Sequence, residues 1–187
     1  MLRRTTTRQV ARVYGVFIAK YPDPWSLLAA DLTDLETILK PLGLRHRVKQ
    51  LLALAEKVTR ELGGKVPCSV DALKKLPGVG DYAASEVLLT CCDIPVPLLD
   101  TNVVRLLARV FGVKPTRSPP YKDLEYYEFV KRLVPEDPEL ARAFNYGAMD
   151  LAREVCKARR PKCDLCPLRG MCLHARLGES TYVKRGK

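Results

Sequence analysis

The sequence predicts an all-α protein, and three observations point to that fold class. Apolar residues recur every three or four positions over most of the chain, whereas the alternation typical of a β-strand persists nowhere. Glycines and prolines punctuate these segments at short intervals, which predicts many short helices rather than a few long ones. A hydrophobic fraction of 47% in 187 residues is enough for a globular core, and no apolar run is long enough to span a membrane.

The helices are expected in a simple order along the chain. The first is amphipathic, with apolar residues at Val10, Val13, Tyr14 and Phe17. Helical spacing of apolar residues recurs in four later segments, at 28–39, 51–62, 103–110 and 140–151. Between them, Pro95 and Pro97 exclude helix on both sides of the segment 94–97. The sequence therefore predicts two helical lobes, residues 1–95 and residues 96–187.

The chain is strongly basic. Lysine and arginine number 32 against 21 aspartates and glutamates, which gives a formal charge of +11. Such an excess predicts a polyanionic partner, most often nucleic acid, although a generally basic, solvated surface would give the same sum. The distribution of charge along the chain favours a nucleic-acid partner, because no acidic residue precedes Asp23. A second basic cluster consists of Lys157, Arg159, Arg160 and Lys162.

Four cysteines form a compact cluster late in the chain. Six, two and five residues separate them, in the order Cys156, Cys163, Cys166 and Cys172. A disulfide knot is disfavoured, because the chain has seven cysteines, an odd number, and no secretory signal precedes them. Four thiolates can hold either a tetrahedral zinc ion or an iron–sulfur cluster, and the spacing leaves both open.

A glycine-rich turn separates two short helices expected over residues 70–75 and 81–90. The turn consists of Leu76, Pro77, Gly78, Val79 and Gly80. Its glycines permit backbone angles that other residues avoid, and its amides lead into a helix N-terminus, which forms a small anion cradle. A DNA phosphate fits such a cradle without any reading of base sequence. The alternative is an ordinary helix–turn–helix corner.

Together these motifs resemble those of the helix-hairpin-helix DNA glycosylases of the endonuclease III superfamily. The similarity lies in LPGVG at 76–80, LLDTNVVRLLARVFG at 98–112, FNYGAMDLA at 144–152 and the four cysteines, in that order. The resemblance implies two helical lobes with a cleft between them, one carrying the hairpin and the other a [4Fe–4S] cluster held by the cysteines. It also implies double-stranded DNA as the partner, with a damaged or mismatched base flipped into the cleft. In the resembling enzymes a longer segment precedes the equivalent of residues 2–6, so the chain is expected to lack the family's N-terminal helices.

Single positions separate the chemistries within this superfamily. A glycosylase that also cleaves the strand needs a lysine two residues after the hairpin's second glycine, to form a Schiff base with the sugar. Here that residue is Tyr82, so the resemblance implies hydrolysis of the glycosidic bond without strand cleavage. Tyr82, with Arg3 and Arg4, is similar to the thymine/uracil mismatch glycosylases, which act on G·T and G·U pairs. The MutY-type adenine glycosylases, which act on adenine opposite guanine or 8-oxoguanine, are the second interpretation. A truncated, catalytically impaired DNA-binding module is the third.

Asp100 supports two interpretations that can both hold. An aspartate just before an apolar-periodic helix is commonly an N-cap. In the resembling family, the aspartate of this motif stabilises the positive charge that builds on C1′ or activates the attacking water. The resemblance thus implies Asp100 and Tyr82 as catalytic residues and Asn102 as a supporting residue. Arg3, Arg4, the hairpin and the basic cluster are expected to bind DNA.

Nothing in the sequence predicts an oligomer or a membrane protein. We expect a monomer in the cytoplasm of a prokaryote, with the nucleoid. Fourteen prolines and many arginines are typical of a thermophile.

Overall fold

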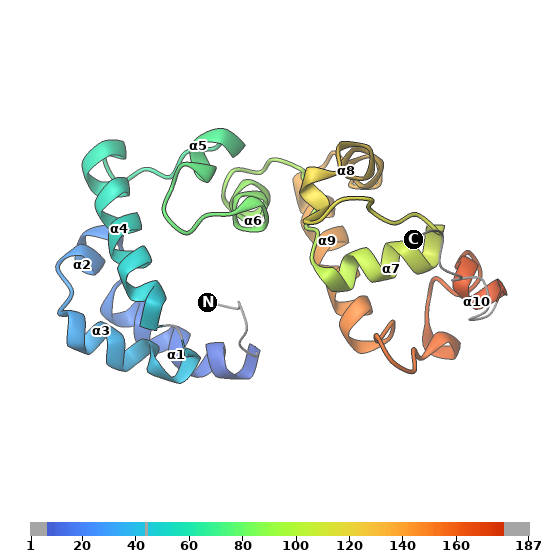
Figure 1. Ribbon diagram of the computed structural model, residues 1–187, viewed down its shortest axis with the longest axis horizontal. Helices are drawn as coiled ribbons and strands as arrows, with labels where there is room; N and C mark the ends of the chain where they lie inside the picture. The colour runs from blue at the N-terminus through green and yellow to red at the C-terminus, as the bar shows by residue number, and fades with distance from the viewer. Residues whose placement is uncertain (1–6, 44, 178–187) are drawn as a thin grey trace. The chain divides into compact units, whose positions relative to one another are not determined.

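The computed structural model describes residues 7–43 and 45–177, and these residues are helical without a β-strand (Figure 1). The predicted all-α class is confirmed. The described part of the chain contains α1 (Thr7–Lys20), α2 (Pro24–Leu28), α3 (Leu32–Leu39), α4 (Arg45–Leu62), α5 (Val70–Lys74), α6 (Asp81–Cys91), α7 (Thr101–Phe111), α8 (Leu124–Lys131), α9 (Pro138–Glu154) and α10 (Leu173–Leu177). Short 3₁₀ turns add η1 (Lys40–Leu42), η2 (Pro120–Lys122) and η3 (Cys163–Leu165). None of the helices in the described ranges combines the length and apolarity needed to cross a bilayer.

The chain divides into two compact units, residues 1–80 and 81–187. Helix α6 belongs to the second unit, because it packs against α9. Residues 93–100 contain no helix, in keeping with their prolines. The division into functional lobes after residue 95 stays a prediction.

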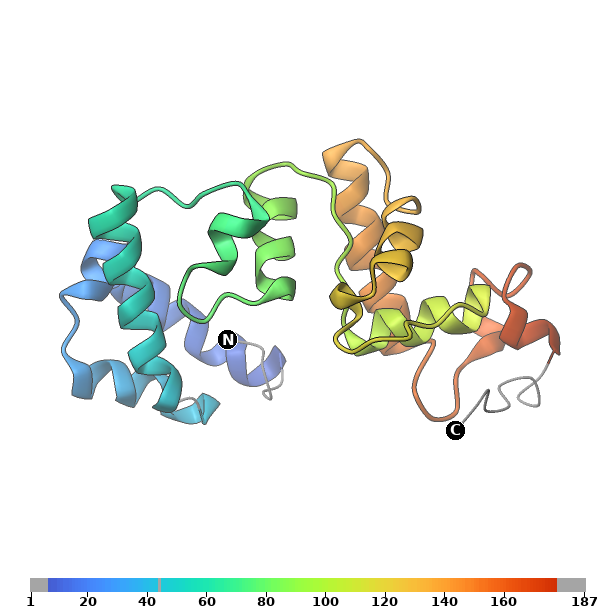
Figure 2. The ribbon, with the colours of Figure 1, turned by 45° about the horizontal axis from the view of Figure 1, so that its top comes forward.

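The first unit is a helical bundle with its own core. Helix α4 packs against α2 and α3, and α1 packs against α3 and η1 (Figure 2). Their buried side chains are Val13, Phe17, Tyr21, Leu35, Leu39, Leu42 and Val48. Tyr14, which we expected on the apolar face of the first helix, is instead 54% exposed. Its neighbour Val13 and the residue one turn later, Phe17, define the buried stripe of α1.

The apolar spacing over residues 28–39 does not correspond to one helix. Helix α2 ends at Leu28 and α3 begins at Leu32. The carboxylate of Asp31 accepts a hydrogen bond from the backbone N–H of Asp34 at 2.9 Å and so caps the N-terminus of α3. Because the apolar spacing continues across the break, spacing alone could not locate it.

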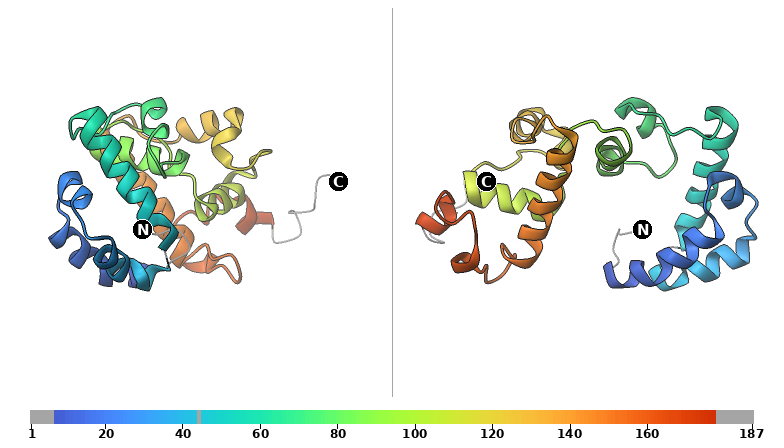
Figure 3. Two further views of the ribbon diagram at one scale, coloured as in Figure 1. Left: turned by 60° about the vertical axis from the view of Figure 1, so that its left-hand side comes forward. Right: turned by 180° about the vertical axis from the view of Figure 1, so that it is seen from behind.

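Helix α7 is central to the second unit and packs against α9 and α10 (Figure 3). One of its faces joins a core with α8, formed by Leu99, Val103, Leu107, Tyr126 and Val130. The adjoining part of the same apolar face joins a second core with two of the cysteines, formed by Leu106, Val110, Ala152, Cys156 and Cys172. The same helix therefore supports the segment of Asp100 at its start and the cysteine segment along its side.

Candidate functional site

The hairpin predicted at residues 76–80 is a turn between α5 and α6. Leu76 is buried, and its carbonyl accepts a hydrogen bond from the N–H of Val79 at 3.2 Å. Gly78 has a φ of +77°, which L side chains rarely adopt, whereas a Cβ there would meet only the Gln50 side chain, at 3.6 Å. The backbone angle, and not crowding, therefore requires glycine. Gly78 and Gly80 are both exposed. Phosphate binding by this turn stays a prediction.

Asp100 caps the N-terminus of α7, as one of its two interpretations required. Its Oδ1 accepts hydrogen bonds from the N–H groups of Asn102 at 2.8 Å and Val103 at 2.7 Å. Its Oδ2 accepts one from Nδ2 of Asn102 at 2.9 Å. A carboxylate has about four lone-pair positions, so these three donors fix its orientation and leave capacity on Oδ2. Asn102 thus contacts Asp100 twice, while the catalytic role of Asp100 and the supporting role of Asn102 stay predictions.

Arg105 continues this network toward the cysteines. One turn after Asn102, its Nη1 donates to Oδ1 of Asn102 at 2.9 Å. Its Nη2 donates to the carbonyl of Ala152 at 2.7 Å and its Nε to the carbonyl of Cys156 at 3.1 Å. Our sequence interpretation missed Arg105. The available signal was a basic residue three positions after Asn102 in a largely apolar helix, which places both on one face.

Two further side chains that we did not predict hold the backbone before Asp100. Asn145 on α9 is 3% exposed, and its Oδ1 accepts a hydrogen bond from the N–H of Leu98 at 2.7 Å. Its Nδ2 donates to the carbonyl of Val96 at 3.1 Å. The hydroxyl oxygen of Tyr121 accepts a hydrogen bond from the N–H of Leu99 at 2.8 Å. These contacts satisfy the buried polar groups of an extended segment, which would otherwise destabilise it.

Tyr82 is half-buried on α6, and its hydroxyl donates to Sδ of Met149 at 3.7 Å. Burial, followed by the negative charges of Glu86 and Asp100, raises the pKa of Tyr82 far above its usual range. The phenol stays neutral at physiological pH, and the negative charge of Asp100 is among the groups that keep it so.

The four cysteines line one pocket, of about 320 Å³ when the solvent at its mouth is included. Cys156 and Cys172 are buried, while Cys163 and Cys166 are partly exposed. Burial, followed by the proximity of the other three cysteines, raises the pKa of Cys163. Thiolates gathered in this way repel one another unless a cationic centre binds them, so the chemistry of the donors fits a metal cofactor.

The donor set is compatible with two kinds of metal centre. A tetrahedral zinc ion needs four sulfurs at about 2.3 Å from a common point. An iron–sulfur cluster instead spreads its cysteine ligands over several irons. Four thiolates can serve as ligands in either kind of centre.

Arg109 fixes the start of the basic cluster. Its Nη1 donates to the carbonyl of Lys157 at 2.7 Å and its Nη2 to the carbonyl of Ala158 at 3.1 Å. All four basic side chains are exposed, and in the described part of the chain none forms an ion pair: Lys157, Arg159, Arg160 and Lys162. Their binding to DNA stays a prediction. Arg3 and Arg4, predicted to join them, lie outside the described residues.

Comparisons with known proteins agree with this geometry. A thymine-DNA glycosylase from Aeropyrum pernix is 48% identical over 175 residues, covering 93% of this chain and 78% of the relative. A thymine/uracil-DNA glycosylase from Pyrobaculum aerophilum is 51% identical over 169 residues, covering 90% of this chain and 74% of the relative. The solved structure of a thermostable thymine-DNA glycosylase superposes with a TM-score of 0.86 at 32% identity, covering 95% of this chain and 81% of that one.

Two family models match. The iron–sulfur binding domain of endonuclease III matches residues 156–172, which run from the first to the last of the four cysteines. The predicted [4Fe–4S] cluster is confirmed, and the zinc alternative is set aside. The second model spans residues 1–132, including the hairpin and the Asp100 motif. This chain belongs to the HhH-GPD superfamily of base excision DNA repair proteins.

Proposed function

We propose that this protein is a monofunctional DNA glycosylase that removes thymine or uracil mispaired with guanine. One observation carries the reaction type: three hydrogen bonds fix the carboxylate of Asp100, while a phenol, Tyr82, stands at the position where a lyase needs an amine. The base preference is supported by the two relatives at 48% and 51% identity, whose names specify thymine or uracil. We further propose that it acts as a monomer, in the cytoplasm.

The carboxylate of Asp100 is suited to stabilise a cationic sugar. As the glycosidic bond breaks, positive charge develops on C1′, and a preorganised negative group lowers the free energy of that transition state. Three hydrogen bonds hold the carboxylate, so it needs no reorganisation during the reaction. Oδ2, which carries one of the three, is the oxygen with spare capacity for the sugar or for the attacking water.

Tyr82 supports hydrolysis without strand cleavage. A phenol cannot form an imine with C1′, and an imine is the intermediate through which a lysine amine would open the sugar. The nearest lysines in the sequence, Lys74 and Lys75, lie before the hairpin at the end of α5. We therefore propose that the product is an intact strand with an abasic site.

The hairpin and the basic cluster are suited to hold the DNA backbone without reading its sequence. The hairpin offers exposed backbone at Gly78 and Gly80, and the basic cluster offers four exposed cations. Hydrolysis of a glycosidic bond transfers no electrons, so we assign the iron–sulfur cluster a structural role. It ties Cys156 to Cys163 and thereby closes the loop that carries the cations.

A panel of synthetic duplexes tests the proposal. G·T, G·U and 8-oxoG·A duplexes are incubated with the protein and analysed with and without alkali. Strands that break at the thymine or uracil only after alkali support the proposal. Excision of adenine opposite 8-oxoguanine would favour the adenine glycosylase interpretation, and binding without excision would favour the DNA-binding module. Covalent trapping on DNA by borohydride would contradict the absence of lyase activity.

A further inference from the structure

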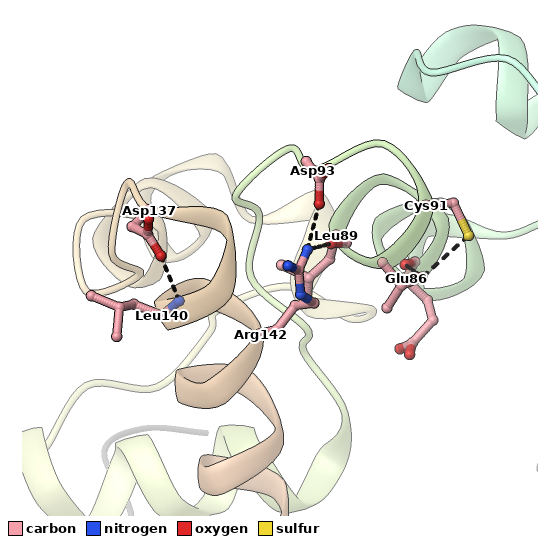
Figure 4. A network of polar contacts seen from close by, with 8 residues as sticks. Glu86, Leu89, Cys91, Asp93, Asp137, Leu140 and Arg142 are labelled. Atoms are coloured by element: carbon pink, nitrogen blue, oxygen red, sulfur yellow. Dashed lines mark hydrogen bonds and ion pairs between the residues drawn. The ribbon is translucent and has the colours of Figure 1, made fainter.

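Three polar contacts join α6 to α9 in antiparallel order. They lie on one face of each helix, because residues 82, 86 and 89 of α6 and residues 142, 146 and 149 of α9 are spaced by three or four. At the far end, Arg142 donates to Asp93 and to the carbonyl of Leu89 (Figure 4). The three contacts pair Tyr82 with Met149, Glu86 with Tyr146, and Leu89 and Asp93 with Arg142.

The middle contact leaves one oxygen without a partner. Oε1 of Glu86 accepts a hydrogen bond from the hydroxyl of Tyr146. Oε2 of Glu86 is buried and, in the described part of the chain, accepts no hydrogen bond. A buried carboxylate oxygen without a donor is costly in free energy, so such an atom in a native protein calls for a specific explanation.

The hydroxyl of Tyr82 is the donor best suited to this oxygen. Tyr82 lies one turn before Glu86 on the same face of α6. Its present acceptor is the thioether of Met149, at 3.7 Å, and a thioether is a weak acceptor compared with a carboxylate. A hydrogen bond with Glu86 is among the causes that raise the pKa of Tyr82, so the phenol lies within reach of this carboxylate as well as of the thioether.

We propose that Glu86 is a positioning residue: its Oε2 takes the hydrogen bond of the Tyr82 hydroxyl when DNA binds and fixes the phenol beside Asp100. Tyr146 holds the other carboxylate oxygen, Oε1, and so restrains the rotation of the carboxylate. The effect of Glu86 on base excision therefore passes entirely through the hydroxyl of Tyr82. This inference rests on the proposed glycosylase function.

Electrostatics agree with the geometry. Burial is the largest cause of the raised pKa of both Tyr82 and Tyr146, and in both the charge of Glu86 and a hydrogen bond with Glu86 come next. The other charged or titratable groups that act on Tyr82 are Asp100 and Tyr121. Those that act on Tyr146 are Cys91 and Arg142. Of all these groups, only Glu86 acts on both phenols, so its removal has a signature at two sites.

A double-mutant cycle tests the inference. Single-turnover excision rates are measured for wild type, Glu86→Gln, Tyr82→Phe and the double variant on a G·U duplex. We expect Glu86→Gln and Tyr82→Phe each to slow excision about tenfold, the effect of one well-placed hydrogen bond. The double variant should be within about twofold of Tyr82→Phe, because Glu86 has no other route to the reaction. An effect of Glu86→Gln that persists fully in the Tyr82→Phe background would overturn the proposal and point to direct contact with the substrate.

A second measurement does not depend on catalysis. Carbon NMR of ring-labelled tyrosine reports the environment of each neutral phenol at working pH, and Glu86→Gln should shift the ring-carbon resonances of both Tyr82 and Tyr146. Glu128→Gln is the matched control, since Glu128 is an exposed carboxylate whose charge acts on a different phenol, Tyr127. It should leave Tyr82, Tyr146 and the excision rate unchanged.

These two measurements separate the two failures. A wild-type protein that excises no base would defeat the proposed function, and the NMR spectra would still report the coupling of Glu86 to Tyr82. An active wild type whose Glu86→Gln variant matches it in both excision rate and Tyr82 resonances would overturn the inference alone.

Discussion

The start of α7 and the cysteine segment beside it are held in opposite ways. Asp100 is fixed by donors within three residues of it, the amides of Asn102 and Val103 and the side chain of Asn102. The basic cluster is fixed from a distance, by two arginines of α7 that reach carbonyl groups about fifty residues later in the chain: Arg105 to Ala152 and Cys156, and Arg109 to Lys157 and Ala158.

The geometry of Asp100 therefore depends on neighbouring residues of α7, whereas the geometry of the basic cluster depends on residues far away in the sequence. A capping carboxylate keeps its geometry as long as α7 exists, because its donors belong to that helix. The basic cluster keeps its geometry only when α7, α9 and the cysteines are all in place. Substitutions near Asp100 should therefore change chemistry with little effect on folding, whereas substitutions at the cysteines should change folding and DNA binding together.

The largest expected effect is on chemistry alone. Asp100→Asn keeps the size and capping ability of the side chain but removes the negative charge near C1′. We expect excision to slow by roughly a thousandfold, with unfolding free energy changed by less than about 0.5 kcal/mol. Single-turnover rates, thermal unfolding and duplex affinity measure the three consequences.

Asp137→Asn is the matched control for that substitution. Asp137 caps α9 through the N–H of Leu140 at 2.9 Å and has no predicted role in chemistry. It should leave the excision rate unchanged. If Asp100→Asn excised bases at a rate within a few fold of wild type, Asp100 would be only a helix cap and not a catalytic residue.

The second-largest effect is expected at the cysteines, on which the geometry of the basic cluster depends. Cys166→Ser removes one of the four thiolates, so the variant should lose iron and its brown absorbance near roughly 400 nm. We expect the cysteine segment to unfold and DNA affinity to fall with it, as iron content, circular dichroism and duplex binding would show. Cys91→Ser, at an exposed thiol outside the cluster, is the control. A Cys166→Ser protein that stays folded and binds DNA normally would contradict the scheme.

Arg105 connects the two regions and should show an intermediate effect. Arg105→Gln removes the donors to Asn102, Ala152 and Cys156. We expect excision to slow about tenfold, since Asn102 loses the group that orients it while the cap on Asp100 persists. Arg153→Gln, an exposed arginine on α9, serves as control. Unchanged excision in Arg105→Gln would show that the two regions are independent.

The smallest effect concerns the DNA backbone. Arg159→Ala combined with Arg160→Asn should weaken binding to all duplexes and flatten the log–log salt dependence by up to about two. Asparagine is chosen at 160 because φ there is +52°, which alanine adopts only with strain. Affinity measured across a series of salt concentrations gives the slope. An unchanged slope would exclude these two arginines from phosphate contact.

Features formed by residues close together in the sequence could be predicted, whereas contacts between residues far apart in the sequence could not. The hairpin and the cap on Asp100 follow from residues within five positions of one another, and the cysteine cluster from spacing within seventeen, so all three could be read from the chain. Packing alone brings together the hydrogen-bond partners of Asn145, Tyr121 and Glu86. The sequence does not show which distant group a polar side chain on a helix will contact. The break between α2 and α3 was not predicted for another reason: the helical spacing of apolar residues continues across it.

The contacts of Arg109 with two cysteines bear on how the protein matures. Its Nη1 donates to Sγ of Cys156 at 3.4 Å, and its carbonyl accepts from Sγ of Cys172 at 3.4 Å. The first and last of the four cysteines thus both contact one residue of α7, Arg109. A newly made chain can offer incoming iron and sulfide two thiols already anchored on α7, so cluster insertion has to order only the segment between them, which lowers its entropic cost.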